Sequence, residues 1–257
     1  MTTDASTVEP SRAVELVDYV THTTCAIVHA ADDRSVMETL ETLPAIIAST
    51  RAIIGDKPYH IGPSAIAARN NPYGKGVAGN AANGRVCLTD SDPRQRGLFN
   101  AAWTLGYVAA CAYGGLAAVA MGAVTGPLGF IYRRADYAEP NFDSIDGPSV
   151  YPAFHVMAGL ARGCGRRLAE VRMSPAGRAA ALAWREGDRV VLWLANLTAE
   201  PLELRIGGLG ESGRRLSVID ASAFEQAVRS TGALDALSRP FEGMELTLDA
   251  YAAARID

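Results

Sequence analysis

The chain has 257 residues, a length that suits one large domain or two ordinary ones and allows a sizeable core without disulfides. Its 24 basic and 28 acidic residues give a net charge of −4, so no overall positive field favours nucleic acid as a partner. Hydrophobic residues make up 49% of the chain, which excludes a wholly disordered protein.

Cysteine usage and the N-terminus predict a cytoplasmic protein. The four cysteines are scattered and form no C-x-x-C pair, which disfavours a zinc ribbon or a disulfide framework. We expect free thiols in a reducing compartment. Residues 1–10 contain no apolar run typical of a secretory signal, and we expect this segment to be disordered.

One uncharged run is long enough to span a bilayer. No charged residue occurs from Gly97 to Tyr132, but Gly114, Gly115 and Pro127 interrupt this run. Ala and Gly, which dominate it, contribute little to transfer into lipid. We therefore predict buried core here, and no membrane partner.

The first half of the chain alternates strand and helix patterns. Pro44 predicts a kink or a split in a helix over 33–54, and Asp92 followed by Pro93 is typical of a helix start. Three strand–helix units with apolar strands indicate a parallel sheet. The predicted strands are Val14–Val20, Lys57–Ile61 and Leu116–Met121, the predicted helices are 33–54, 92–113 and 149–162, and the long loops are 62–92 and 122–148.

After Gly165 the pattern changes to antiparallel β structure. Ala179–Trp184 and Val190–Asn196 flank a turn signal and predict a hairpin. We predict a small antiparallel β-sandwich with Trp184 and Trp193 in its core. The further predicted strands are 202–206, 216–219, 244–248 and 251–256.

Three strand–helix units cannot close a (β/α)8 barrel. The chain is therefore either a small three-layer domain or the carboxyl portion of a barrel enzyme, and we favour the second because long loops follow its strands. The predicted fold class is α/β plus all-β, with a partial (β/α)8 TIM-type barrel of the last three βα units at 11–165 and the sandwich at 166–257. Open barrel edges predict self-association.

Several segments carry a resemblance to a known family. They are Val17–Thr24, His29–Leu40, Lys57–Ser64, Arg69–Gly74 and Asp92–Gly97. In residues, order and spacing they resemble the D-apionate lactonase family, over about residues 14–256. The resemblance implies a TIM barrel followed by a β-sandwich, similar to clan A glycoside hydrolases, with the three predicted strands as the last of the barrel. It also implies hydrolysis of D-apionolactone to D-apionate in carbohydrate catabolism.

Lactone hydrolysis needs a group that activates water, donors for the oxyanion and an acid for the leaving alkoxide. In a barrel such groups follow the carboxyl ends of the strands. His22 is the first candidate for general base or acid, because histidine titrates near neutrality. His29 and Asp32 are further catalytic candidates as an imidazole–carboxylate pair. A structural role for His22 and helix capping by Asp32 are the open alternatives.

A larger set of residues is predicted to bind substrate. Arg69 would bind the developing negative charge, and the polar loop around it would recognise hydroxyl groups. Turn chemistry is an equally open interpretation of 69–73, and a packed histidine is one for His60. Ser64 lacks the G-x-S-x-G pattern of a nucleophile. The predicted substrate-binding residues are Thr24, His60, Ser64, Arg69, Asn70, Asn71 and Tyr73.

The end of the second predicted strand, Ile61 to Ser64, carries no glutamate. A retaining glycosidase needs two carboxyl groups, so this absence argues against glycoside cleavage and is compatible with ester chemistry. Two alternatives stay open: a fragment of a clan A-like glycoside hydrolase, and an inactive sugar-binding remnant.

The histidines show no spacing typical of a metal site. His22, His29, Asp32 and His60 carry suitable ligand atoms, but no H-x-H or H-E-x-x-H pattern occurs. We predict no metal and no cofactor, and a small carbohydrate lactone as the partner.

Overall fold

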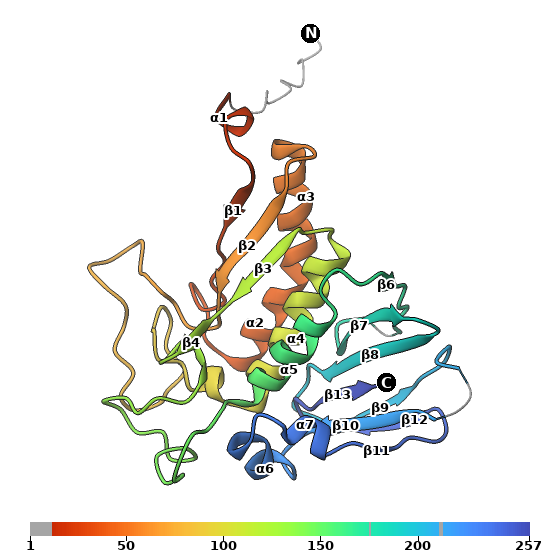
Figure 1. Cartoon of the computed structure of the whole chain (residues 1–257). Helices are drawn as coiled ribbons and strands as arrows, with labels where there is room; N and C mark the ends of the chain where they lie inside the picture. Colours follow the sequence, from red (N-terminus) through yellow and green to blue (C-terminus); the bar gives the residue numbers. More distant parts are fainter. Residues whose placement is uncertain (1–11, 175, 211–212) are drawn as a thin grey trace.

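The computed structural model describes residues 12–174, 176–210 and 213–257. The segment 1–10, which the sequence predicts to be disordered, lies outside the described residues. In Figure 1 the first part of the chain forms a parallel sheet backed by helices, and the second part forms antiparallel sheets beside those helices.

Three parallel strands form the first sheet: β1 (Val20–His22), β2 (Tyr59–Ser64) and β3 (Ala118–Met121). They lie in the order β1-β2-β3, with Val20 opposite Tyr59 and His60 opposite Ala118. The prediction that these three segments are neighbours and run in the same direction is confirmed.

The parallel sheet buries one face and leaves the other open. Tyr59 and Ile61 are buried among the helices, because alternate residues of a strand face opposite sides. His60 and Ala118 lie on the opposite face, where the Tyr19 ring stacks on His60 with centroids 4.4 Å apart. Tyr19 is 51% exposed, so this part of the open face is accessible to solvent.

Short and long helices alternate with the three strands. The predicted split of the helix over 33–54 is confirmed, and Pro44 lies in the first turn of the second piece, where its missing N–H costs nothing. The helix predicted over 92–113 is divided at Gly97 into a 3-10 helix and an α-helix. Asp92 caps the first of them as predicted, by accepting a hydrogen bond from the Arg94 N–H. The helices are α1 (Arg12–Glu15), α2 (Asp33–Glu38), the 3-10 helix η1 (Thr39–Thr42), α3 (Leu43–Ile54), the 3-10 helix η2 (Pro93–Arg96), α4 (Leu98–Tyr113) and α5 (Pro152–Arg162).

All three predicted parallel strands differ in their bounds from the structure, and the third, predicted from Leu116, begins only at Ala118. The segment Val14–Val20 is not a strand, because β1 begins only at Val20. Leu16 and Val17 are exposed and pair with no strand in the described part of the chain, and an extended segment without a partner is not stable. β2 continues to Ser64, past its predicted end, because Ser64 still pairs with β3.

The uncharged run from Gly97 to Tyr132 is core only in its helical part, because Ala118 and Val124 in its later part are exposed. It contains α4, β3 and a small parallel pair, β4 (Ala123–Thr125) and β5 (Gly129–Ile131). α4 buries Trp103 and Tyr107 almost completely. No helix within the described ranges has the length and apolarity that crossing a membrane requires.

The second part of the chain contains a six-stranded and a two-stranded antiparallel sheet. The larger sheet has the order β11-β10-β13-β8-β7-β6, and β12 pairs with β9. The predicted hairpin is confirmed as β7 and β8, joined at Gly187, whose φ of 63° suits glycine. The elements are β6 (Leu168–Ala169), β7 (Ala179–Glu186), β8 (Arg189–Asn196), β9 (Leu202–Arg205), β10 (Arg215–Ile219), α6 (Phe224–Arg229), α7 (Ala233–Ala236), β11 (Arg239–Pro240), β12 (Glu245–Leu248) and β13 (Ala253–Ile256).

The two parts of the chain share one hydrophobic core, because α4 and α5 pack against β7 and β8. Trp184 and Trp193 are buried as predicted, but their rings pack against the helices. Gly159 and Gly163 of α5 lie directly against these two rings. The opposite face of the larger sheet packs on β12 and β9 through a separate apolar cluster that includes Leu192.

His155 is expected to make the stability of this junction depend on pH. It is buried in α5, its Nε2 lies 2.8 Å from the Ala227 carbonyl, and burial lowers the pKa of its imidazole. Between the ordinary value of 6.5 and the lowered folded value, the unfolded chain binds more protons than the folded chain. The stability contributed by neutral His155 is therefore complete above that window, and it falls as pH drops through it.

We expect His155→Gln to reduce this loss of stability on acidification, because a glutamine amide donates the same hydrogen bond without titrating. Urea denaturation between about pH 8 and pH 5 measures the free energy of unfolding of both proteins. His29→Gln, at an exposed histidine, is the matched control and should follow the unaltered chain. A difference between His155→Gln and the unaltered chain that stays constant across this range would contradict the assignment.

Candidate active site

The carboxyl ends of the three parallel strands meet at one edge of the sheet. Beyond the strands, Cys25 still bridges to Ala65, and Ser64 pairs with Met121. The segment 65–92 after β2 and the segment 122–148 after β3, which contains the short strands β4 and β5, extend from this edge and lie together in Figure 1. Because strand ends and loops of this kind carry the reactive groups of parallel α/β folds, this edge is the candidate active site.

Ser64 and Thr24 belong to a polar cluster on the helix side of this edge. Ser64 is fully buried and accepts a hydrogen bond from the Tyr107 hydroxyl at 3.0 Å. The Thr24 Oγ1 lies 2.7 Å from the same hydroxyl, and burial raises the pKa of Tyr107. The cluster ties β1 and β2 to α4. Tyr107 was missed by the sequence analysis, since nothing local marks a helical tyrosine as a partner of two strand ends.

His22 lies on the helix-facing side of β1. Its Nε2 is 2.6 Å from the Tyr59 hydroxyl, and its Nδ1 is 3.3 Å from the Thr23 carbonyl. Both ring nitrogens therefore have partners within the protein. The neighbouring Thr23 points instead toward the open side, where its hydroxyl donates to the Pro63 carbonyl at 2.6 Å.

His29 and Asp32 lie between β1 and α2. His29 is exposed, and its ring centroid is 6.2 Å from that of Tyr73 in the loop after β2. Asp32 caps α2 by accepting the Ser35 N–H at 2.8 Å, and hydrogen bonds from Ser35 lower the pKa of its carboxyl. The structure thus shows the capping role of Asp32, while its pairing with His29 stays a prediction.

The predicted substrate loop forms a tight polar turn. The Arg69 guanidinium donates to the Gly122 carbonyl and so joins the loops after β2 and β3. Asn70 accepts the Asn71 N–H, and Asn71 in turn accepts the Tyr73 N–H at 2.9 Å. Turn chemistry is therefore present here, and it leaves the Tyr73 ring 74% exposed.

Buried charges hold the loop after β2, and the sequence analysis did not single them out as an ion-pair network. Arg94 and Asp92 have side chains only 2% and 0% exposed and form two contacts, Nη2–Oδ2 at 2.6 Å and Nε–Oδ1 at 2.9 Å. Arg94 also reaches Asp33 at 3.2 Å, and the more exposed Arg85 pairs with Asp33 at 2.7 Å. The network connects this loop to the start of α2.

A second buried pair holds the loop after β3. Arg96 and Glu139 approach to 3.6 Å between Nη1 and Oε1, and the Tyr151 hydroxyl donates to Glu139 at 2.8 Å. Burial raises the pKa of the Glu139 carboxyl. Arg96 also donates to Asn83 at 2.6 Å, so both long loops share this residue. Charged side chains such as arginine and glutamate ordinarily indicate surface positions, which is why the sequence analysis did not find this pair.

The candidate residues therefore fall into two groups. His22, Thr24 and Ser64 lie on the helix side, bonded to protein groups, whereas the exposed His29, Arg69 and Tyr73 lie in the loops. His60 lies near the start of β2 on the open face of the sheet, away from the carboxyl edge, and is stacked on Tyr19. No group of three or more His, Cys, Asp or Glu side chains in the described part of the chain is arranged to hold a metal ion.

Comparisons with family models show which class of protein the two domains belong to. Residues 11–165 match the family model of the D-apionate lactonase TIM barrel domain, and residues 176–256 match that of the D-apionate lactonase C-terminal immunoglobulin-like domain. The chain is a TIM barrel domain followed by an immunoglobulin-like domain, and it belongs to the D-apionate lactonase family.

A curated relative supports the same assignment. The D-apionate lactonase of Brucella anthropi is 39% identical over 192 residues, which cover 75% of this chain and 30% of the relative. The chain thus spans about a third of the length of the curated relative it matches.

Solved structures share the fold. An arabinose-bound α-L-arabinofuranosidase of glycoside hydrolase family 51 has a TM-score of 0.57 at 12% identity, covering 93% of this chain and 36% of that one. A family 86 β-porphyranase from Bacteroides plebeius has a TM-score of 0.52 at 10% identity, covering 95% and 42%. Identities this low show a glycoside hydrolase-like fold and nothing of the reaction.

Proposed function

We propose that this chain forms part of a hydrolase that opens a sugar-acid lactone, D-apionolactone, to give D-apionate. The observation that carries the proposal is the 39% identity to a named D-apionate lactonase. The absence of a glutamate at the end of β2, where Ser64 and Ala65 stand, supports ester chemistry over retaining glycoside cleavage.

We further propose that β1, β2 and β3 are the last three strands of an eight-stranded barrel. The open face of the sheet supports this, because Tyr19 and Ala118 are exposed where a closed barrel would bury them in its interior. The same unpaired edges and open face would bind a complementary barrel half or, in its absence, a second copy of the chain.

The exposed group of loop residues suits the chemistry of ring opening best. We assign the acid–base step to His29, because it is exposed at the carboxyl edge, whereas both nitrogens of His22 already have partners. Arg69 belongs to the same loop after β2 as Tyr73, whose ring approaches His29, and would stabilise the oxyanion. Asn70, Asn71 and Tyr73 would bind the hydroxyl groups of the substrate. Thr24, Ser64 and His22 would hold the strand ends in place through their hydrogen bonds to protein groups, and His60 through its stacking on Tyr19.

The proposal is tested by completing the barrel. We expect the purified chain alone to open D-apionolactone slowly or not at all, and to gain activity when mixed with the part of the Brucella anthropi relative that lies outside the matched region. A pH-stat assay measures ring opening, and sedimentation shows whether the two polypeptides combine or the chain pairs with itself. Combined polypeptides that cleave aryl glycosides, or that bind sugars and open no lactone, would contradict the proposal.

Variants of the combined protein separate the two histidines. We expect His29→Ala to lower kcat by about 100-fold or more, the usual contribution of general acid–base catalysis. His22→Ala should affect thermal stability more than kcat, because it removes the hydrogen bond to Tyr59. The reverse pattern would assign the acid–base step to His22.

A further inference from the structure

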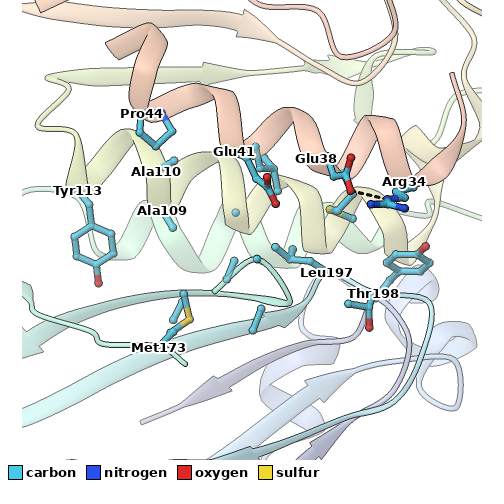
Figure 2. A pocket seen from close by; sticks show the side chains of 18 of the residues that line it. Arg34, Glu38, Glu41, Pro44, Ala109, Ala110, Tyr113, Met173, Leu197 and Thr198 are labelled. Carbon is cyan, nitrogen blue, oxygen red and sulfur yellow. Dashed lines mark hydrogen bonds and ion pairs between the residues drawn. The ribbon is translucent and has the colours of Figure 1, made fainter. Parts of the chain in front are cut away.

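A cleft lies between the two parts of the chain, away from the candidate active site. Its volume is about 740 Å³, within the range of small-molecule sites. It runs between the α2–α3 helices and α4 on one side and the C-terminal domain on the other (Figure 2). Among the described residues, none of the loops at 62–92 and 122–148 lines it, so it is separate from the site of ring opening.

The floor of the cleft is apolar, and charged side chains lie along its helix-side wall. Leu40, Ala109 and Ala180 are buried in the floor. At the mouth, Tyr113 and Met173 are 44% and 43% exposed, although both side chains are large and apolar. A lining of this kind favours a ligand with an apolar body, and it offers few partners for the hydroxyl groups of a sugar.

One carboxylate of the lining, the exposed Glu41, lies within electrostatic range of Arg34 but forms no ion pair with it. Of the acidic residues in the lining, Asp33 is paired with Arg85 and Arg94, and Glu38 is paired with Arg34 at 2.6 Å. Glu41 takes part in no ion pair within the described part of the chain, and in Figure 2 it lies on the helix side of the cleft, with Met173 on the opposite side.

From the cavity, its lining and Glu41 we infer that the cleft is a binding site for a small organic cation, an ammonium group carried on an aryl or alkyl body. A neutral apolar ligand would remove water from Glu41 without compensation, whereas a cation would form an ion pair with it. The Tyr113 ring and the Met173 thioether at the mouth suit such a ligand, because aromatic faces attract ammonium groups and thioethers adapt to apolar surfaces.

The test is a calorimetric titration of the full chain with two probes of matched shape, 4-phenylbutylamine and its neutral analogue 4-phenylbutanol. We expect saturable binding of the amine and binding of the alcohol that is about fivefold weaker, the effect of one partly exposed ion pair. In Glu41→Gln the two probes should bind equally, at the affinity of the alcohol. The assay requires no lactone-opening activity, so its outcome is independent of the proposed function.

Two further variants locate the site. Ala110→Phe places a ring in the cleft and should abolish binding of both probes. Met173→Lys, at an exposed position, adds a positive charge opposite Glu41 and should lower the affinity of the amine to that of the alcohol or below, a readout that stands even if Ala110→Phe does not fold. Failure of both probes to bind the unaltered chain would overturn the inference. So would equal affinities for the two probes, or a preference for the amine that persists in Glu41→Gln.

Discussion

Replacing Arg94 with methionine is expected to lower the free energy of unfolding by about 3–5 kcal/mol. The side chains of Arg94 and Asp92 are only 2% and 0% exposed, and two short contacts join them. Removing the guanidinium leaves the Asp92 carboxylate buried and uncompensated, and this penalty accounts for most of the cost. Methionine keeps most of the packing that Arg94 makes over the Phe99 ring.

The neighbouring Arg85 provides the control. It pairs with Asp33 at a similar distance of 2.7 Å, but the two side chains are 45% and 41% exposed. Arg85→Met should therefore cost at most about 1 kcal/mol. Adding Asp92→Asn to Arg94→Met should restore much of the loss, because asparagine is neutral and still caps the helix. Urea denaturation measures all four proteins, and equal effects of Arg94→Met and Arg85→Met would refute the role of burial.

Gly159→Ala is expected to destabilise the protein by about 2–3 kcal/mol, although alanine is the better helix former by about 1 kcal/mol. A Cβ at this position of α5 would lie 2.0 Å from Cζ2 of Trp193. The Trp193 side chain is fully buried and cannot rotate away, so α5 must shift from the sheet. The contact therefore sets how closely the barrel domain and the C-terminal domain can pack.

The control is a glycine whose surroundings leave room for a Cβ. Replacing it with alanine makes the same change of residue type without the steric clash expected at Gly159. At Gly79 a Cβ would meet no atom within 4 Å, and its φ is not positive, so Gly79→Ala should change stability by less than about 0.5 kcal/mol. Combining Gly159→Ala with Trp193→Phe should cost less than the sum of the two single changes, because the smaller ring makes room. Thermal denaturation checks these values, and strict additivity would contradict the steric account.

Local patterns in the sequence were enough to predict most of the elements. Pro44 predicts the break in the first helix, Asp92 predicts the cap of the next, and the two apolar runs around Gly187 predict the β7–β8 hairpin. Each of these features depends on residues a few positions apart, whose backbone restrictions and hydrogen bonds act over the same short range. The family resemblance, carried by motifs such as Arg69–Gly74, is also a property of the sequence alone.

The distribution of the candidate site residues depends on contacts that are distant along the chain. His22 has its ring nitrogens occupied because β1 and β2 pair in the register that places Tyr59 beside it. Ser64 is buried because Tyr107, on another element, reaches it. The direction of a strand side chain follows from the register of pairing, and register is set by the whole sheet.

Residue types and their spacing along this chain thus establish its elements, its family and the side chains available for chemistry. Which of them lie free at the carboxyl edge, and which are buried as ion pairs such as Arg96 with Glu139, follows from packing. The free-energy cost of desolvating a charged side chain is offset only where the fold brings a partner of opposite charge to it, and that partner is usually far away in the sequence.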